Sequence, residues 1–487
     1  MTVQVAIEAR AVSHRSRVGE ISVRDVSMTI GQGELVAIIG GRGTGKSALL
    51  DALSGLLSPS SGTVLRSPQS EDQPSADQNG AAVLSGSTVR RQIGYVPVGE
   101  TIHPVLPLGR ALRYSAELRG VVSPGENGDG DLDDALRAVN LSGKARVPVG
   151  DLNPGERKRA AIAAELLGRP EQLFLDDPTA SLDPAQAMEV LRLLRRLSDD
   201  GMTVVLTTTS AMDADRCDKV ALLATGGHLA FYGTPAAARG YFGADSLEEI
   251  YERLVGLGDP AAAWSRRFYQ FPRTRGSAPV PTMPRAPGPA VLVPDAAGPH
   301  SAGRPSLPFV DDAEPEDRGT QEPEHAQPTG SPRPLRQLPV LIRRNAEALA
   351  RSRQQQGILA VVPLAILLVF CVLLGVGALD GPAAVTLAWA VLGSLVTGLA
   401  YGLPKRAPEA GMLRRERFAG VSVPVFLAAK AALLVPALAA ASLIILAVPA
   451  SAARLQAGFE VSYLAVFAAS LIGLAAAAAS IRPSQEE

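Results

Sequence analysis

The chain of 487 residues is poor in cysteine and in aromatic residues, and its net charge is only −1. Its two cysteines, Cys217 and Cys371, lie far apart and have no spacing typical of a metal site or a disulfide framework, which indicates a reducing compartment. The small net charge gives no indication of nucleic acid, so we expect no such partner. Residues 1–10 lack the apolar core of a signal peptide, so we expect any membrane insertion to use internal segments.

A glycine-rich run follows the apolar segment 35–39 and is the strongest signal in the chain. The run reads Gly40, Gly41, Arg42, Gly43, Thr44, Gly45, Lys46 and Ser47. It fits a phosphate-binding loop between a strand and a helix, in which backbone N–H groups turn toward the anion. Lys46 can reach the β- and γ-phosphates, and the Ser47 hydroxyl can ligate Mg²⁺. An accidental glycine-rich turn is the alternative, but it requires neither the lysine nor the serine. The run predicts a nucleoside triphosphate site.

Composition divides the chain into four parts. Residues 1–245 mix charged residues with apolar periodicity, as in a globular domain. Residues 246–271 have helical spacing, and we interpret their aromatic side chains as packing residues; these are Trp264, Phe268, Tyr269 and Phe271. Residues 272–334 are rich in proline, glycine and alanine without periodicity, which predicts a disordered linker. Residues 335–487 are dominated by alanine, leucine and valine.

Four apolar runs in the last part predict an all-α transmembrane domain. They cover about residues 358–379, 383–403, 425–448 and 461–481, and each has the length needed to cross roughly 30 Å of hydrocarbon. A buried core helix is the alternative for any single run, but four in succession favour a membrane. We expect Lys430, near the start of the third run, to lie at the membrane interface.

Basic residues flank these runs unevenly and predict the orientation. Before the first run and between the second and third stand Arg333, Arg336, Arg343, Arg344, Arg351, Arg353, Lys405, Arg406, Arg414, Arg415 and Arg417. Both segments should therefore be cytoplasmic. With an even number of spans, both termini and residues 1–245 are expected on the cytoplasmic side of the cell membrane.

The soluble part carries further motifs in a characteristic order. They are GTV at 62–64, IGYVP at 93–97, LNPGERKR at 152–159, LFLDDPT at 173–179 and SLD at 181–183. In this order they resemble the nucleotide-binding cassette of an ABC transporter. A cassette that precedes its own membrane domain is similar to the half-transporters of the G subfamily, in particular to actinobacterial members. The resemblance implies an α/β P-loop NTPase fold with a helical subdomain.

The resemblance also implies a dimer, in which two cassettes enclose two molecules of ATP with Mg²⁺. The partner would be a second copy or another half-transporter. Asp176 corresponds to the carboxylate on the Mg²⁺ side, although an acidic strand end can also be a helix cap. Asp183 corresponds to the aspartate that crosses the dimer interface, and Asn153 and Gly155 lie in the signature that faces the partner's phosphates.

Three residues depart from the family where catalysis is expected. Val98 stands in place of a glutamine that senses Mg²⁺ and relays to the membrane domain. Asp177 stands in place of a glutamate that polarises the attacking water; it is still a carboxylate base, but it reaches roughly 1 Å less far. Thr209 stands in place of a histidine near the γ-phosphate. We expect hydrolysis to be weak.

The signature and the adenine site also depart from the family. Asn153 replaces a serine, Pro154 a glycine and Glu156 a glutamine, yet an asparagine cap, a proline in the first turn and a capping-box glutamate still predict a helix start here. Pro154 has no N–H to donate and Glu156 adds negative charge, so closure on phosphate should be weaker. No aromatic residue precedes Gly40 to stack on adenine. His14, Arg15 and Arg17 are alternatives, each also explained as a solvated residue.

Three hypotheses about function follow. The first is an ABC half-transporter that couples ATP binding and hydrolysis to export of a substrate, for which the apolar spans weakly favour a lipid-like compound. The second is a pseudo-ATPase, a membrane scaffold that binds ATP and gates assembly with a partner. The third is a decayed or truncated gene product, since the family norm is six spans and four are expected here.

Overall fold

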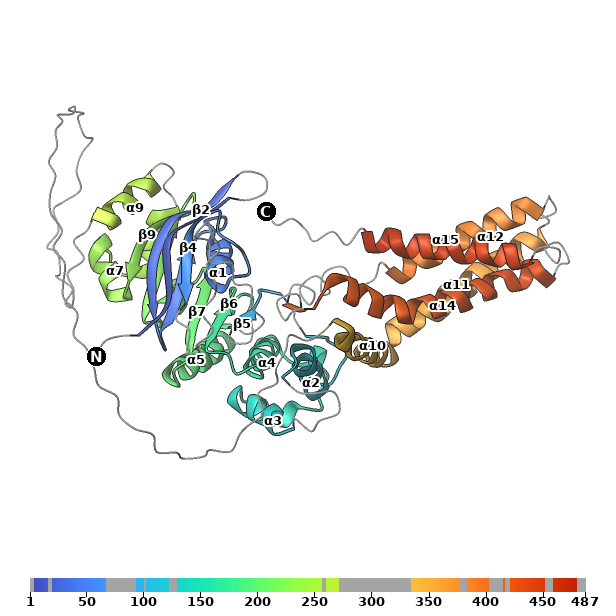
Figure 1. Cartoon of the computed structure of the whole chain (residues 1–487), viewed down its shortest axis with the longest axis horizontal. Coiled ribbons are helices and arrows are strands. Elements are labelled where there is room, and N and C mark those ends of the chain that lie inside the picture. The colour runs from blue at the N-terminus through green and yellow to red at the C-terminus, as the bar shows by residue number, and fades with distance from the viewer. Residues whose placement is uncertain are drawn as a thin grey trace, which may run out of the picture.

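A computed structural model of the chain describes residues 4–15, 20–66, 93–99, 102–121, 129–255, 260–270, 334–376, 383–402, 415–416, 421–451 and 459–479. An α/β unit occupies the N-terminal half, and a helical bundle extends away from it (Figure 1). The predicted linker, 272–334, lies outside the described residues except for Pro334, which begins a helix.

The α/β unit is built on a nine-stranded sheet with the order β4-β1-β2-β9-β8-β3-β7-β6-β5. The strands are β1 (Val5–Arg15), β2 (Ile21–Gly31), β3 (Leu35–Gly40), β4 (Ser61–Arg66), β5 (Ile93–Val96), β6 (Gln172–Leu175), β7 (Thr203–Thr208), β8 (Lys219–Ala224) and β9 (His228–Gly233). β3 lies parallel to β7 and β8, and β6 lies parallel to β5 and β7. The carboxyl ends of β3, β5, β6 and β7 therefore meet at one edge, where α/β folds bind ligands.

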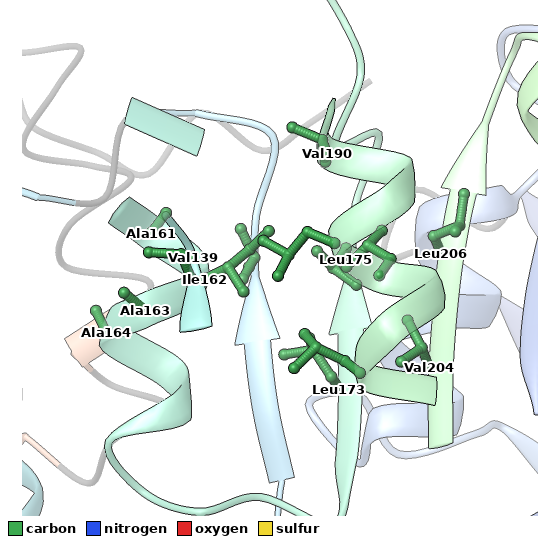
Figure 2. Close-up of a cluster of buried hydrophobic side chains, with 14 of the residues drawn as sticks. Val139, Ala161, Ile162, Ala163, Ala164, Leu173, Leu175, Val190, Val204 and Leu206 are labelled. Carbon is green, nitrogen blue, oxygen red and sulfur yellow. The ribbon is translucent and has the colours of Figure 1, made fainter. Parts of the chain in front are cut away.

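The sequence of β3 explains its central place. All six of its residues are buried; Leu35, Ala37 and Ile39 pack into one core, and Val36 and Ile38 pack into the other. A continuous apolar run is typical of a parallel strand covered on both faces. Figure 2 shows part of the first core, where helices cover β6 and β7.

Helices cover the sheet and form the rest of the cassette. They are α1 (Lys46–Ser54), α2 (Leu108–Arg119), α3 (Asp129–Ala138), η2 (Ser142–Lys144), η3 (Val149–Asp151), α4 (Pro154–Leu166), α5 (Pro184–Asp199), α6 (Ala211–Ala214), α7 (Pro235–Phe242), α8 (Leu247–Val255) and α9 (Pro260–Gln270). α2, α3 and α4 pack together as a helical subdomain beside β5. The α/β fold with a helical subdomain was predicted from the sequence and is confirmed.

The aromatic residues of α9 pack as the sequence analysis interprets them. Trp264 lies 4.8 Å from Phe242 between ring centroids, and Phe268 lies 5.6 Å from Phe231. The hydroxyl of Tyr269 donates to the carbonyl oxygen of Asp25 at 2.8 Å. These contacts hold α9 against β9 and β2. Phe271 lies outside the described residues.

The C-terminal half consists of α10 (Pro334–Arg351), α11 (Arg353–Gly375), α12 (Ala383–Gly402), α14 (Val423–Ser451) and α15 (Phe459–Ala479). α10 packs on α2 of the cassette and on α11 and α14, so it joins the two halves (Figure 1). α12 and α15 approach closely, since a β-carbon on Gly398 would lie 2.0 Å from the carbonyl oxygen of Ser470. Small residues permit such contacts between membrane helices.

Two of these helices are long and apolar enough to cross a bilayer, over Arg353–Leu373 and Val423–Ala447. The apolar segments found in α12 and α15 are shorter, Val385–Tyr401 and Glu460–Ala476. The arrangement with four spans therefore stays a prediction.

Candidate nucleotide-binding site

The phosphate loop joins β3 to α1 at the carboxyl edge of the sheet. Gly45 has a φ of 89°, and a β-carbon there would lie 1.8 Å from the carbonyl oxygen of Ser22, so only glycine fits. The Lys46 ammonium donates to the carbonyl oxygens of Gly40 and Gly41 at 2.8 Å each. The loop brings together all the residues predicted to bind phosphate, Gly40, Gly41, Arg42, Gly43, Thr44, Gly45, Lys46 and Ser47. A helix N-terminus directly after the loop favours an anion.

Asp176 lies beside the start of α1 and is the candidate metal ligand. It is buried, and its Oδ1 accepts from the Ser47 hydroxyl at 3.0 Å and from the Thr207 hydroxyl at 2.6 Å. The paired oxygens of Ser47 and Asp176 fit Mg²⁺, which prefers oxygen ligands. No group of three or more His, Cys, Asp or Glu side chains suits a metal among the described residues. A metal here would complete its shell with phosphate oxygens and water.

Asp177, the candidate base, follows directly and is half-buried. Its backbone N–H donates to the Thr207 hydroxyl at 2.8 Å, and its φ of 42° lies in the left-handed region. Burial and the neighbouring Asp176 raise the pKa of Asp177, while Lys46 and Lys158 oppose the shift. A carboxyl with a raised pKa is a better proton acceptor than an ordinary aspartate.

Thr209 and Val98 flank this cluster and are both exposed. Thr209 follows β7, whose last residue, Thr208, donates to Asp213 at 3.2 Å; Thr179 donates to the same carboxylate at 2.6 Å. Val98 is 52% exposed beyond the end of β5. The structure thus places Thr209 at the edge of the site and gives it no contact that tests its predicted role.

The altered signature begins α4 as predicted. The Asn153 side chain accepts from the Glu156 N–H at 2.8 Å, and the Glu156 carboxylate accepts from the Asn153 N–H at 3.1 Å, which completes a capping box. Lys144 pairs with Glu156 at 3.2 Å and offsets its negative charge. The side-chain oxygen of Asn153 therefore serves its own helix.

Of the other two residues predicted to act across a dimer, Gly155 lies in the first turn of α4 and Asp183 precedes α5. The Gly155 N–H donates to the side-chain oxygen of Gln186 at 3.2 Å, and Asp183 caps α5 by accepting from the Gln186 N–H at 2.8 Å. α4 contacts α2, α3, α5 and β5, whereas α1 contacts β1, β2, β3, β6 and β7. The signature residues are thus held on different elements from the phosphate loop.

Two charged residues of α4 were missed by the sequence analysis. The Lys158 ammonium lies 3.2 Å from the carbonyl oxygen of Val98, at the end of β5. Glu165 is fully buried, accepts from the Tyr95 N–H at 3.1 Å and pairs with Arg119 and with Arg415. The one available signal was their spacing of seven residues, which places both on one face of a helix.

Comparison with known proteins accounts for both halves of the chain. Residues 23–180 match the family model described as ABC transporter, and residues 336–484 match the model described as ABC-2 type transporter. The putative ABC transporter ATP-binding protein VNG_2317G of Halobacterium salinarum is 34% identical over 230 residues, which cover 45% of this chain and 90% of that protein. The chain belongs to the ABC transporter family.

Two longer ABC transporters resemble about half of this chain. ABC transporter ATP-binding/permease protein Rv1747 of Mycobacterium tuberculosis is 34% identical over 270 residues, 55% of this chain and 29% of that protein. ABC transporter G family member 19 of Arabidopsis thaliana is 30% identical over 226 residues, 45% of this chain and 30% of that protein. The chain therefore covers less than a third of either relative. The predicted family and its likeness to G-subfamily transporters are confirmed: this ABC transporter joins a nucleotide-binding cassette and a membrane domain.

Proposed function

We propose that this chain binds MgATP at the phosphate loop, Asp176 and Asp177, and that it drives export across the cytoplasmic membrane as one half of a dimer. Lys46 would hold the phosphates, and Ser47 and Asp176 would hold Mg²⁺. Asp177 would act as the base. Asn153, Gly155 and Asp183 would complete the site of a partner cassette, which is a second copy or another half-transporter. The proposed domains are residues 1–245, 246–271, 272–334 and 335–487.

The observation that carries the proposal is the buried contact between Glu165 and the membrane half. Arg415, between α12 and α14, donates to the Glu165 carboxylate at 2.8 Å, and Arg119 donates to its other oxygen. Burial disfavours the charged carboxylate, but the two arginines outweigh it and hold the pKa of Glu165 below its ordinary value. α4 therefore links the signature at its start to the membrane half at its end.

Two further contacts join the two halves, a third links two segments of the membrane half beside them, and together they support the predicted orientation. Arg343 of α10 donates to Glu117 of α2 at 2.6 Å, and Glu347 accepts from the Tyr114 hydroxyl at 2.6 Å. Arg344 pairs with Glu416, next to Arg415. Arg343 and Arg415 thus pair with carboxylates of the cassette, and Arg344 pairs with a carboxylate of the second basic segment. This arrangement supports a cassette and termini on the cytoplasmic side.

A thiol probe can test whether nucleotide moves the membrane half. The label is placed at the exposed start of α11, outside the apolar run 358–379, by Arg353→Cys in a chain with Cys371→Ser. Cys217 is buried and its pKa is raised by burial to about 12, so a fluorescent maleimide should label position 353. We expect MgATP to change the emission of the labelled chain in lipid, because α4 transmits the change through Glu165. Lys46→Ala should abolish the response.

The control is Lys219→Ala, which removes a lysine that pairs with Glu34 at 2.7 Å, away from the phosphate loop. This variant should keep the response to MgATP. If a direct measurement shows that MgATP is bound but the emission stays constant, the proposed coupling is wrong.

A nucleotide-gated scaffold is the second candidate function. The Asn153 side-chain oxygen is used by its own helix, and exposed Val98 and Thr209 provide neither an amide nor an imidazole to the site. Such a chain would bind ATP and respond to it without turning it over. Steady-state hydrolysis separates the two functions.

A further inference from the structure

An ammonium group from the signature segment 152–159 lies at the carboxyl end of β5. Lys158 is in the second turn of α4, and its Nζ lies 3.2 Å from the carbonyl oxygen of Val98 and 3.4 Å from that of Pro97. Its side chain is partly buried. The carbonyl contacts hold the ammonium at this edge of the sheet. They do not neutralise its positive charge, because carbonyl groups carry no net charge.

This position is next to the two aspartates of the site. The Asp176 N–H donates to the carbonyl oxygen of Val96 at 2.8 Å, which joins the ends of β5 and β6. Burial lowers the pKa of Lys158 to about 8, and Asp177 and then Asp176 oppose the shift. Lys46 acts on the same two carboxylates from α1. Lys46 and Lys158 therefore both act on this pair of carboxylates.

The charge of this pair matters for an anionic ligand. Mg²⁺ held by Asp176 would offset the charge of that carboxylate, which leaves Asp177 as the negative charge that the terminal phosphate of a nucleotide would meet. Lys158 acts on Asp177 within the same subunit and offsets this charge. Its effect falls most strongly on the phosphate nearest to Asp177.

We propose that Lys158 determines the preference for ATP over ADP by balancing the charge of Asp177 toward the γ-phosphate. This role rests on the proposed nucleotide binding. It also means that the backbone carbonyl of Val98 helps to hold the Lys158 ammonium in place, although the Val98 side chain is apolar. It does not depend on hydrolysis, so it applies equally to a transporter and to a nucleotide-gated scaffold.

The test is the affinity of the full chain in lipid for MgATP and for MgADP, measured by calorimetry. Lys158→Met should weaken MgATP binding about tenfold near neutral pH and change MgADP binding much less, because the lost charge acts mainly on the γ-phosphate. Lys158→Arg should keep the ATP preference. Lys219→Met, which removes a lysine of β8 paired with Glu34, should behave as the wild type.

The pH dependence gives a second readout that a structural role would not change. The lowered pKa means that Lys158 carries its charge below about pH 8 and loses it above. The wild type and Lys158→Met should therefore converge in MgATP affinity as the pH rises, while Lys158→Arg keeps the higher affinity. The other charged groups acting on the site are Lys46, Asp176, Asp177 and Asp213, and they are present in all variants. Any decrease in MgATP affinity with rising pH that remains in Lys158→Met is therefore caused by these other groups.

The outcomes separate this proposal from the proposed function. If the wild type binds ATP in a manner that requires Lys46, but Lys158→Met keeps the wild-type ratio of ATP to ADP affinity at every pH, the role of Lys158 is wrong and the proposed function stands. If the wild type binds neither nucleotide, both are wrong. Lys158→Arg guards against a folding defect, because it preserves the charge and the length of the side chain.

Discussion

At the scale of single residues, the sequence predicts the part of the site that is built from consecutive positions. Lys46, Ser47 and Asp176 could be placed because each follows an apolar strand and strand ends meet at one edge of a parallel sheet. Lys158 could not be placed in this way. Its partners, the carbonyl oxygens of Pro97 and Val98, are 61 and 60 residues away in the sequence. Every residue has a backbone carbonyl oxygen, so the residue types do not show which of them accept from Lys158.

Asp177 provides a direct test of the chemistry. Asp177→Asn should lower the rate of ATP hydrolysis by about a hundredfold or more, because an amide cannot accept the proton of the attacking water. Asp177→Glu should raise the rate several-fold by restoring reach, although the left-handed backbone at this position suits aspartate better. Steady-state phosphate release measures both. Unchanged turnover in Asp177→Asn would exclude Asp177 as the base. Asp199→Asn, at an exposed aspartate that pairs with Arg195 along α5, is the control and should keep the wild-type rate.

At the scale of elements, α4 runs from the signature segment to the contact with the membrane half. Its start was predicted, because the capping box uses residues within one turn. The environment of its far end was not, because Glu165 is paired with Arg119, 46 residues away, and with Arg415, 250 residues away. From the sequence alone, a glutamate in a helix is expected to be exposed, because glutamate is rarely buried without a partner and the sequence does not show the partners.

Removing the charge of Glu165 should destabilise the protein. Glu165→Gln removes the buried carboxylate that pairs with Arg415 and Arg119, which costs about 3–5 kcal/mol of unfolding free energy. Glu165→Gln with Arg415→Met should cost less than the sum of the single changes. Because the pKa of Glu165 is held below its ordinary value of 4.5, the contribution is present above that pH and is lost as the pH falls through the lowered pKa. Glu165→Gln should lack this loss in acid.

Denaturant unfolding in detergent, followed by tryptophan emission, measures these changes. Glu249→Gln serves as the control, since it removes an exposed glutamate that pairs with Arg253 along one helix. This variant should change stability by less than about 1 kcal/mol. Equal effects of Glu165→Gln and Glu249→Gln would contradict a special role for the buried contact.

At the scale of the whole molecule, composition predicts the division into a cassette and a membrane domain. Apolar runs locate the helices of the membrane half, and strand β3 follows from its continuous apolar sequence. The packing of α10 against α2 could not be predicted, because it depends on charges such as Arg343 and Glu117 from segments 226 residues apart. These contacts join the two halves.

The central claim is that nucleotide at the cassette drives the membrane half. The most direct measurement is ATP binding and steady-state hydrolysis by the purified chain in lipid, with Lys46→Ala as the control. We predict binding together with slow turnover, both lost in Lys46→Ala, since Lys46 is the phosphate-loop cation. Binding without turnover would contradict ATP-driven transport by this chain and leave a nucleotide-gated subunit.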